Sequence, residues 1–134
     1  MKYKLLIILF FSCIVQGCAT YHITTESLLE QLVNSNQEQK STYLFAAPFV
    51  IPTEVTGNSL REIKVLDKDE KEQTIQVTNR TGIRIWKRDG SKKTFYFNTL
   101  LVKDSFIIGK LDHFVGVDIK PINLNNIEKI ELQK

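Results

Sequence analysis

The chain has 134 residues, which suits one small domain, and 43% of them are hydrophobic, so an ordinary core can form. Its formal net charge is +3, but Lys2 and Lys4 lie in an N-terminal segment that we expect to be removed. The remaining 16 basic side chains nearly balance 15 acidic ones. Overall charge therefore gives no reason to expect nucleic acid as a partner.

The N-terminal segment has the pattern of an export signal. Lys2 and Lys4 precede an almost unbroken apolar run over residues 5–14. About 11 residues of helix rise only ~16 Å, roughly half of the ~30 Å needed to cross a bilayer core. This length is typical of a signal peptide rather than a permanent span, so we expect residues 1–17 to be a cleaved signal peptide. The alternative is a buried N-terminal helix or strand, which a run without a polar face disfavours.

The residues that end this segment, Val15-Gln16-Gly17-Cys18, resemble the lipobox of bacterial lipoproteins. Gln16 replaces the usual small residue, whereas the other three fit the motif. The resemblance implies a lipid thioether on Cys18, cleavage by signal peptidase between Gly17 and Cys18, and acylation of the new amine, with palmitate among the acyl groups. Several acyl chains anchor a protein stably where one does not. Because Ala19 is not aspartate, the resemblance also implies the outer membrane, with the domain facing the periplasm.

The two cysteines fit the same interpretation. Cys13 lies in the segment expected to be removed, and Cys18 is the expected lipid attachment site. No cysteine then remains in the domain for a disulfide or a Cys-based metal site. We expect no cofactor.

One helix is predicted after a short lipidated tether over residues 18–25. Thr24 or Thr25 can cap it. Apolar residues then recur at helical spacing: Leu28, Leu29, Leu32 and Val33. This pattern predicts an amphipathic helix over residues ~26–36, at the start of a single domain that spans 26–134.

The rest of the domain, residues ~42–132, has the pattern of short β-strands. The apolar run over 42–51 is interrupted by Pro48 and ended by Pro52, which predicts an edge strand, a bulged strand or a covering segment. Asp89-Gly90 predicts a hairpin turn after an alternating segment. Further strands are predicted at residues 60–66, 74–78, 83–87, 94–102, 105–109, 117–119 and 127–132, of which 94–102 is long enough to bend.

These elements predict a mainly β (α+β) fold, in which one N-terminal amphipathic helix precedes a small antiparallel sheet or barrel. The order of elements over residues ~73–132 resembles SH3-like and Sm-like barrels. That resemblance concerns the fold and implies no ligand.

The sequence offers no catalytic or metal-binding constellation. His22 falls in the expected tether, and His113 follows Asp112 without a Ser or Cys partner. Together with Asp118 these residues match no metal-ligand spacing. We therefore predict a non-enzymatic protein with no catalytic residue and no metal site.

Basic and aromatic residues concentrate around the predicted hairpin. Six basic residues and one tryptophan fall between positions 80 and 93: Arg80, Arg84, Trp86, Lys87, Arg88, Lys92 and Lys93. Such a pattern can bind single-stranded nucleic acid, but an exported lipoprotein meets anionic head groups or an acidic protein instead. Arg84, Trp86, Lys87 and Arg88 form our candidate interaction face. The alternative is a hairpin whose outward face is merely solvated by charged side chains.

As a whole the chain resembles small Bacteroidota lipoproteins for which no activity is established. The segments that carry this resemblance are residues 18–22 (CATYH), 25–31 (TESLLEQ), 119–122 (IKPI) and 127–131 (IEKIE). The resemblance implies a location and not a function. The sequence therefore predicts a membrane-anchored, non-enzymatic lipoprotein of the cell envelope that works through contacts with an envelope protein. The alternative is a periplasmic binding module for a lipid, glycan or peptide.

Overall fold

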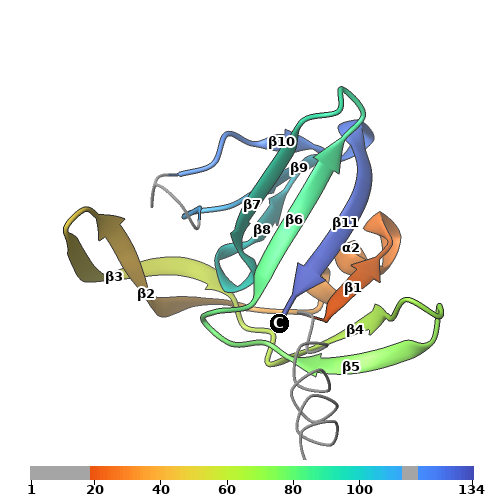
Figure 1. The fold of residues 1–134 in the computed structure, drawn as a ribbon, viewed down its shortest axis with the longest axis horizontal. Helices are drawn as coiled ribbons and strands as arrows, with labels where there is room; N and C mark the ends of the chain where they lie inside the picture. Colours follow the sequence, from red (N-terminus) through yellow and green to blue (C-terminus); the bar gives the residue numbers. More distant parts are fainter. Residues whose placement is uncertain (1–18, 113–117) are drawn as a thin grey trace, which may run out of the picture.

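The computed structural model describes residues 19–112 and 118–134, which form three antiparallel β-sheets and one α-helix (Figure 1). The largest sheet has six strands in the order β5-β4-β1-β11-β6-β7. Their bounds are β1 Thr20–Ile23, β4 Glu62–Leu66, β5 Glu72–Gln76, β6 Gly82–Lys87, β7 Lys92–Tyr96 and β11 Ile127–Gln133. The predicted mainly β, antiparallel architecture is confirmed.

Strand β1 lies in the middle of this sheet, although the sequence predicted a tether over residues 18–25. It pairs antiparallel with β11, from Thr20 opposite Gln133 to Ile23 opposite Ile130. Its other edge meets β4. Residues 20–23 therefore belong to the sheet and not to a tether, because a strand at the other end of the chain supplies their backbone partners.

Helix α2 (Thr25–Val33) follows β1 directly. The Thr24 side chain caps it by accepting a hydrogen bond from the backbone N–H of Ser27 at 3.1 Å. Leu28 and Leu32 are buried in the core. Compared with the predicted range of 26–36, the helix begins one residue earlier and ends three residues earlier, where Asn34 caps it.

The predicted long strand over residues 94–102 is instead broken by a single helical turn. β7 ends at Tyr96, the 3-10 helix η1 spans Phe97–Thr99, and β8 covers Leu101–Lys103. The Thr99 hydroxyl holds this turn by donating to the carbonyl oxygen of Tyr96 at 2.8 Å. β8 then joins a second sheet in the order β10-β9-β8, with β9 at Phe106–Ile108 and β10 at Ile122–Asn123. A second 3-10 helix, η2 (Leu124–Asn126), leads into β11.

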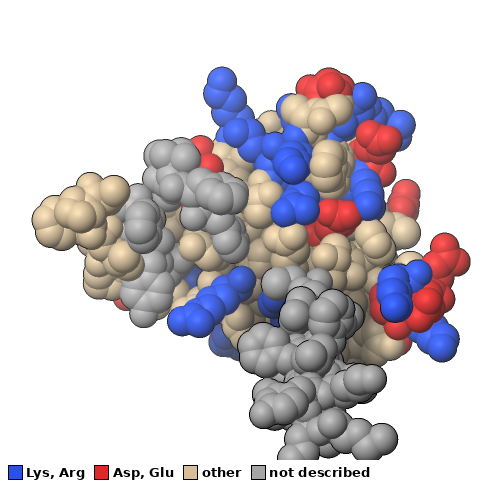
Figure 2. Space-filling model, in the orientation of Figure 1, with Lys and Arg blue, Asp and Glu red and all other residues tan. Residues whose placement is uncertain are grey.

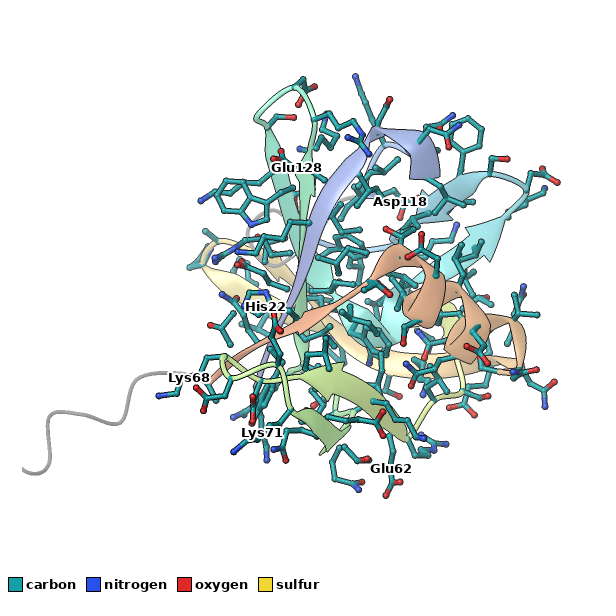
Figure 3. The ribbon with its side chains drawn as sticks, turned by 90° about the vertical axis from the view of Figure 1, so that its right-hand side faces the viewer. His22, Glu62, Lys68, Lys71, Asp118 and Glu128 are labelled. Carbon is teal, nitrogen blue, oxygen red and sulfur yellow. The ribbon has the colours of Figure 1, made fainter. Side chains whose placement is uncertain are left out.

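The core lies on one side of the six-stranded sheet, and the alternation of the strands places it there. On β6, Ile83 and Ile85 are fully buried, while Arg84 and Trp86 point to the opposite face. Figure 3 shows His22 of β1 on that opposite face too, on the side away from α2. Core side chains come from both larger sheets and the helix: Leu28, Leu32, Ile63, Val65, Ile75, Phe95, Phe97, Leu100, Ile107, Ile130 and Leu132.

Strands β2 (Gln37–Ala46) and β3 (Phe49–Asn58) form a separate two-stranded ribbon, which we call the arm. Their register runs from Gln37 opposite Asn58 to Ala46 opposite Phe49. Figure 1 shows the arm projecting sideways from the body. In the described part of the chain each of its strands pairs only with the other, which agrees with the edge position that its prolines predicted.

Candidate functional site

The candidate interaction face lies on the exposed side of the six-stranded sheet, where pairing strands bring side chains into two rows. In one row Trp86 of β6 lies between Lys92 of β7 and Lys129 of β11. In the next row Arg84 lies beside Glu131. Figure 2 views this face and shows Lys and Arg side chains gathered over β6, β7 and β11 around a small acidic area. Two of the predicted site residues, Arg84 and Trp86, thus share one surface.

Glu131 is the centre of this surface, with a side chain only 10% exposed. Its Oε2 accepts a hydrogen bond from Trp86 Nε1 at 3.1 Å and lies 3.6 Å from Arg84 Nη1, while its Oε1 lies 2.5 Å from Lys129 Nζ. Burial raises the pKa of Glu131. The hydrogen bonds from Lys129 and Trp86, together with the charges of Lys129 and Arg84, outweigh burial and hold that pKa below its ordinary value of 4.5. The charged carboxylate therefore positions three neighbouring side chains at neutral pH.

The Trp86 ring is held between Glu131 and Lys92. Lys92 Nζ lies over the ring, 4.9 Å from its centroid, in a cation–π contact. Beside the ring is an open hollow of about 250 Å³, lined by Trp86, Glu128 and Lys129. The arrangement offers an apolar ring framed by fixed charges, and Trp and Arg are the residue types enriched at the energetic centres of protein interfaces.

The other two predicted site residues, Lys87 and Arg88, serve the β6–β7 turn instead. Lys87 Nζ lies 3.3 Å from Asp89 Oδ2. Hydrogen bonds from the Ser91 hydroxyl and backbone N–H lower the pKa of Asp89 to about 2, with burial opposing them and Lys87 adding to them. Arg88 Nε donates to the Asn125 carbonyl oxygen at 3.0 Å, which ties the hairpin to η2. The structure therefore separates these two cations from the Glu131-centred cluster.

The residues that sequence reasoning missed come from the two chain ends. Lys129 and Glu131 lie on β11, where they alternate with the apolar residues Ile130 and Leu132, and this alternation was the sequence signal that could have placed them outward. His22 is the register partner of Glu131 on β1. A hollow of about 340 Å³ lies beside it, lined by residues of β1, β4 and β11, by Thr24 and the start of α2, and by Arg88.

The remaining sequence predictions concern the lipid anchor and metal binding. Gly17, Cys18 and His113 lie outside the described residues. Over residues 19–112 and 118–134, no helix is long and apolar enough to cross a membrane. Within the same ranges no group of three or more His, Cys, Asp or Glu side chains is placed to hold a metal ion.

Comparison with known proteins gives no further guide to this site. The chain matches no known protein family, no curated protein and no solved structure.

Proposed function

We propose that the chain is a membrane-anchored lipoprotein of the bacterial cell envelope. The proposal rests on the basic N-terminus, the apolar run over residues 5–14 and the lipobox-like residues 15–18. Signal peptidase would cleave between Gly17 and Cys18. Acyl chains on Cys18, palmitate among them, would then hold the domain on the outer membrane, facing the periplasm.

Incorporation of labelled palmitate tests this anchor, and the chain offers a matched control. Cys18→Ala should abolish labelling and leave a precursor that keeps residues 1–17. Cys13→Ala removes the only other cysteine and should label and mature as the wild type does. A Cys18→Ala variant that labels like the wild type would show that the anchor is assigned wrongly.

We further propose that the domain has no catalytic activity and binds another envelope protein through the face around Glu131. The observation that carries this proposal is the contact set of Glu131, which fixes Arg84, Trp86 and Lys129 before any partner arrives. Side chains that are already ordered lose little entropy on binding. Three cations, Arg84, Lys92 and Lys129, surround the single carboxylate of Glu131, so the face has an excess of positive charge. It therefore suits an acidic segment that places an apolar side chain beside Trp86.

In-cell cross-linking of the tagged protein, followed by mass spectrometry of what is attached, tests this face. Lys92→Glu reverses one charge beside Trp86, and Lys71→Glu makes the same change at an exposed position in the β4–β5 turn. One reproducible envelope partner should appear with the wild type and with Lys71→Glu and should be strongly reduced with Lys92→Glu. Equal recovery from all three proteins, or no partner for an abundant protein, contradicts the proposal.

A second candidate function is a periplasmic binding module for a lipid, glycan or peptide. It is favoured by the hollow of about 340 Å³ beside His22, whose lining combines apolar Leu66 and Ile127 with charged Arg88 and Lys129. That volume is at the lower end of the range for small-molecule sites. Native mass spectrometry of the purified protein distinguishes the two functions, because a ligand binder should carry a small molecule of constant mass whereas a protein-binding domain should not.

We also propose that residues ~73–132 form an SH3-like or Sm-like barrel. A bridge between Phe95 and Asp112, and a hydrogen bond from the Tyr96 N–H to the Leu111 carbonyl oxygen at 3.3 Å, link β7 to the segment between β9 and β10. The two sheets thereby enclose one core. An experimental structure tests this proposal, since a closed circuit of paired strands would support it and two open sheets would contradict it.

A further inference from the structure

The arm is firmly attached at its base. Asn58 of β3 is 1% exposed, and its Nδ2 donates to the carbonyl oxygens of Phe97 at 2.8 Å and Leu100 at 3.0 Å. Gly57 lies so close to η1 that a Cβ there would be 1.8 Å from the carbonyl oxygen of Asn98. These contacts fix the direction in which the arm leaves the body.

The far end of the arm is apolar and exposed. Phe49, Val50 and Ile51, which we call the tip, are 67%, 54% and 46% exposed. Residues 41–53 contain no charged side chain. A two-stranded ribbon is only marginally stable by itself in water, and a contiguous exposed apolar surface marks an interaction site. The tip therefore requires a covering surface.

A hollow of about 290 Å³, with aliphatic and polar side chains in its lining, lies at the base of the same arm, between the end of α2 and β8. Its lining residues are Leu32, Val33, Ser35, Gln37, Asn58, Leu100, Leu101 and Val102. Val33 is 76% exposed there. Gln37 and Ala46 stand at opposite ends of β2, about 30 Å apart at ~3.3 Å per residue. The tip therefore cannot reach the hollow of its own chain.

We propose that a second copy of this chain covers both surfaces: two arms lie antiparallel, with β2 against β2, and each tip seats in the hollow at the base of the other arm. In a symmetric pair centred between Ser41 and Thr42, Gln37 of one copy lies opposite Ala46 of the other. Each tip then arrives beside the partner's hollow. Because both copies use the same surfaces, the contact closes as a two-fold dimer and does not extend into a fibre.

The proline positions select β2 as the pairing edge. Pro52 removes one backbone donor from β3, whereas residues 37–46 of β2 contain no proline. That edge of β2 pairs with no other strand within residues 19–112 and 118–134, and pairing with a second β2 would satisfy its backbone groups. A bilayer would offer those groups no hydrogen-bond partner. A second copy thus fits both the edge and the tip, and a bilayer fits only the tip.

Cysteine cross-linking between two differently tagged copies of the full chain tests the contact. One copy carries Phe49→Cys and the other Val33→Cys, both in a Cys13→Ala background, and isolated membranes are treated with a short bis-maleimide. The two tags should appear in one cross-linked band. The control pair replaces Val33→Cys with Thr74→Cys, an exposed position on β5, and should give no such band. Equal bands from both pairs, or none from either, overturns the proposal.

Sedimentation of the full chain in mild detergent gives a second measurement. The wild type and Lys71→Glu should sediment as dimers, whereas Ile51→Lys should sediment as a monomer. The circular dichroism spectrum of Ile51→Lys should match that of the wild type, because Ile51 is exposed and its replacement leaves the core intact. A wild type that stays monomeric overturns the proposal. A bilayer location of the tip would also overturn it. In that case Phe49→Cys would give no cross-linked band, and it would react with a water-soluble maleimide in detergent but not in membranes.

Discussion

Replacing Asn58 with alanine tests whether buried hydrogen bonds hold the arm to the body. The side chain donates to Phe97 and Leu100 and accepts from the Leu60 N–H at 3.2 Å. Alanine removes all three bonds, and a net loss of about 1 kcal/mol for each gives a destabilisation of about 3 kcal/mol. This is a large share of the ~5–15 kcal/mol by which such domains are stable, and it corresponds to a fall in Tm of about 10 °C.

Urea unfolding followed by the fluorescence of Trp86, the single tryptophan of the chain, measures this loss. Asn79→Ala, in an exposed turn, is the matched control and should change the free energy of unfolding by no more than about 0.5 kcal/mol. Asn58→Asp should be less stable than Asn58→Ala, because a carboxylate would then face two carbonyl oxygens without a proton to donate. A cost below about 1 kcal/mol for Asn58→Ala, or an Asn58→Asp variant as stable as the wild type, would refute the reasoning.

Three further predictions test the backbone, the core and the charged cluster. Gly57→Ala should displace the arm, because the new Cβ would lie 1.8 Å from the backbone oxygen of Asn98, and limited proteolysis of the arm measures this change. The control is Gly90→Ala, whose Cβ would meet no atom within 4 Å. It should lower the free energy of unfolding in urea by only ~1–2 kcal/mol, because the φ of residue 90 is +81°. Leu28→Ala should cost ~2–5 kcal/mol in the same assay, since the side chain is 0% exposed. The pKa of Glu131 is held below 4.5 in the folded state, so its contribution to stability is present above that pH and is lost as pH falls through the folded pKa. Unfolding midpoints measured at decreasing pH should therefore fall less steeply for E131Q than for the wild type.

The elements predicted correctly are those whose signals are local. Asp89-Gly90 stands between two β-prone segments, and the β6–β7 hairpin turns there with Gly90 at a φ of +81°. Strand β1 is four residues long, so its alternation is too short to indicate a strand, and its partner β11 lies at the other end of the chain. The break at η1 was hidden for another reason, because residues 94–102 are β-prone and largely apolar, and the turn over Phe97–Thr99 is itself buried like a strand.

In the candidate site, too, the residues with a local signal were predicted and those that depend on distant pairing were missed. Arg84 and Trp86 alternate with buried isoleucines on β6, so their shared outward face was readable from the sequence. Glu131 becomes their neighbour only because β11 pairs with β6, and no local pattern encodes that pairing. Lys87 and Arg88 are close to Trp86 in sequence, but the hairpin turn and η2 take up their polar groups.

The position of β1 also narrows the kind of partner that an anchored domain can meet. Under the proposed anchoring, Cys18 precedes Thr20 by two residues, which is at most about 7 Å of extended chain. β1 pairs with β4 on one side and β11 on the other, so this link cannot lengthen without breaking the central sheet. The domain would then stay at the membrane surface, where another membrane-bound protein can present an acidic segment.

A spacer tests that consequence directly. Inserting a flexible Gly-Ser segment between Ala19 and Thr20 leaves Cys18 and every described strand in place, so palmitate labelling and the free energy of unfolding should match those of the wild type. The yield of the cross-linked partner should fall, because the face around Glu131 would no longer be held at a fixed distance from the membrane. An undiminished yield would show that the partner reaches the domain from the periplasm, and the argument from the position of β1 would then be wrong.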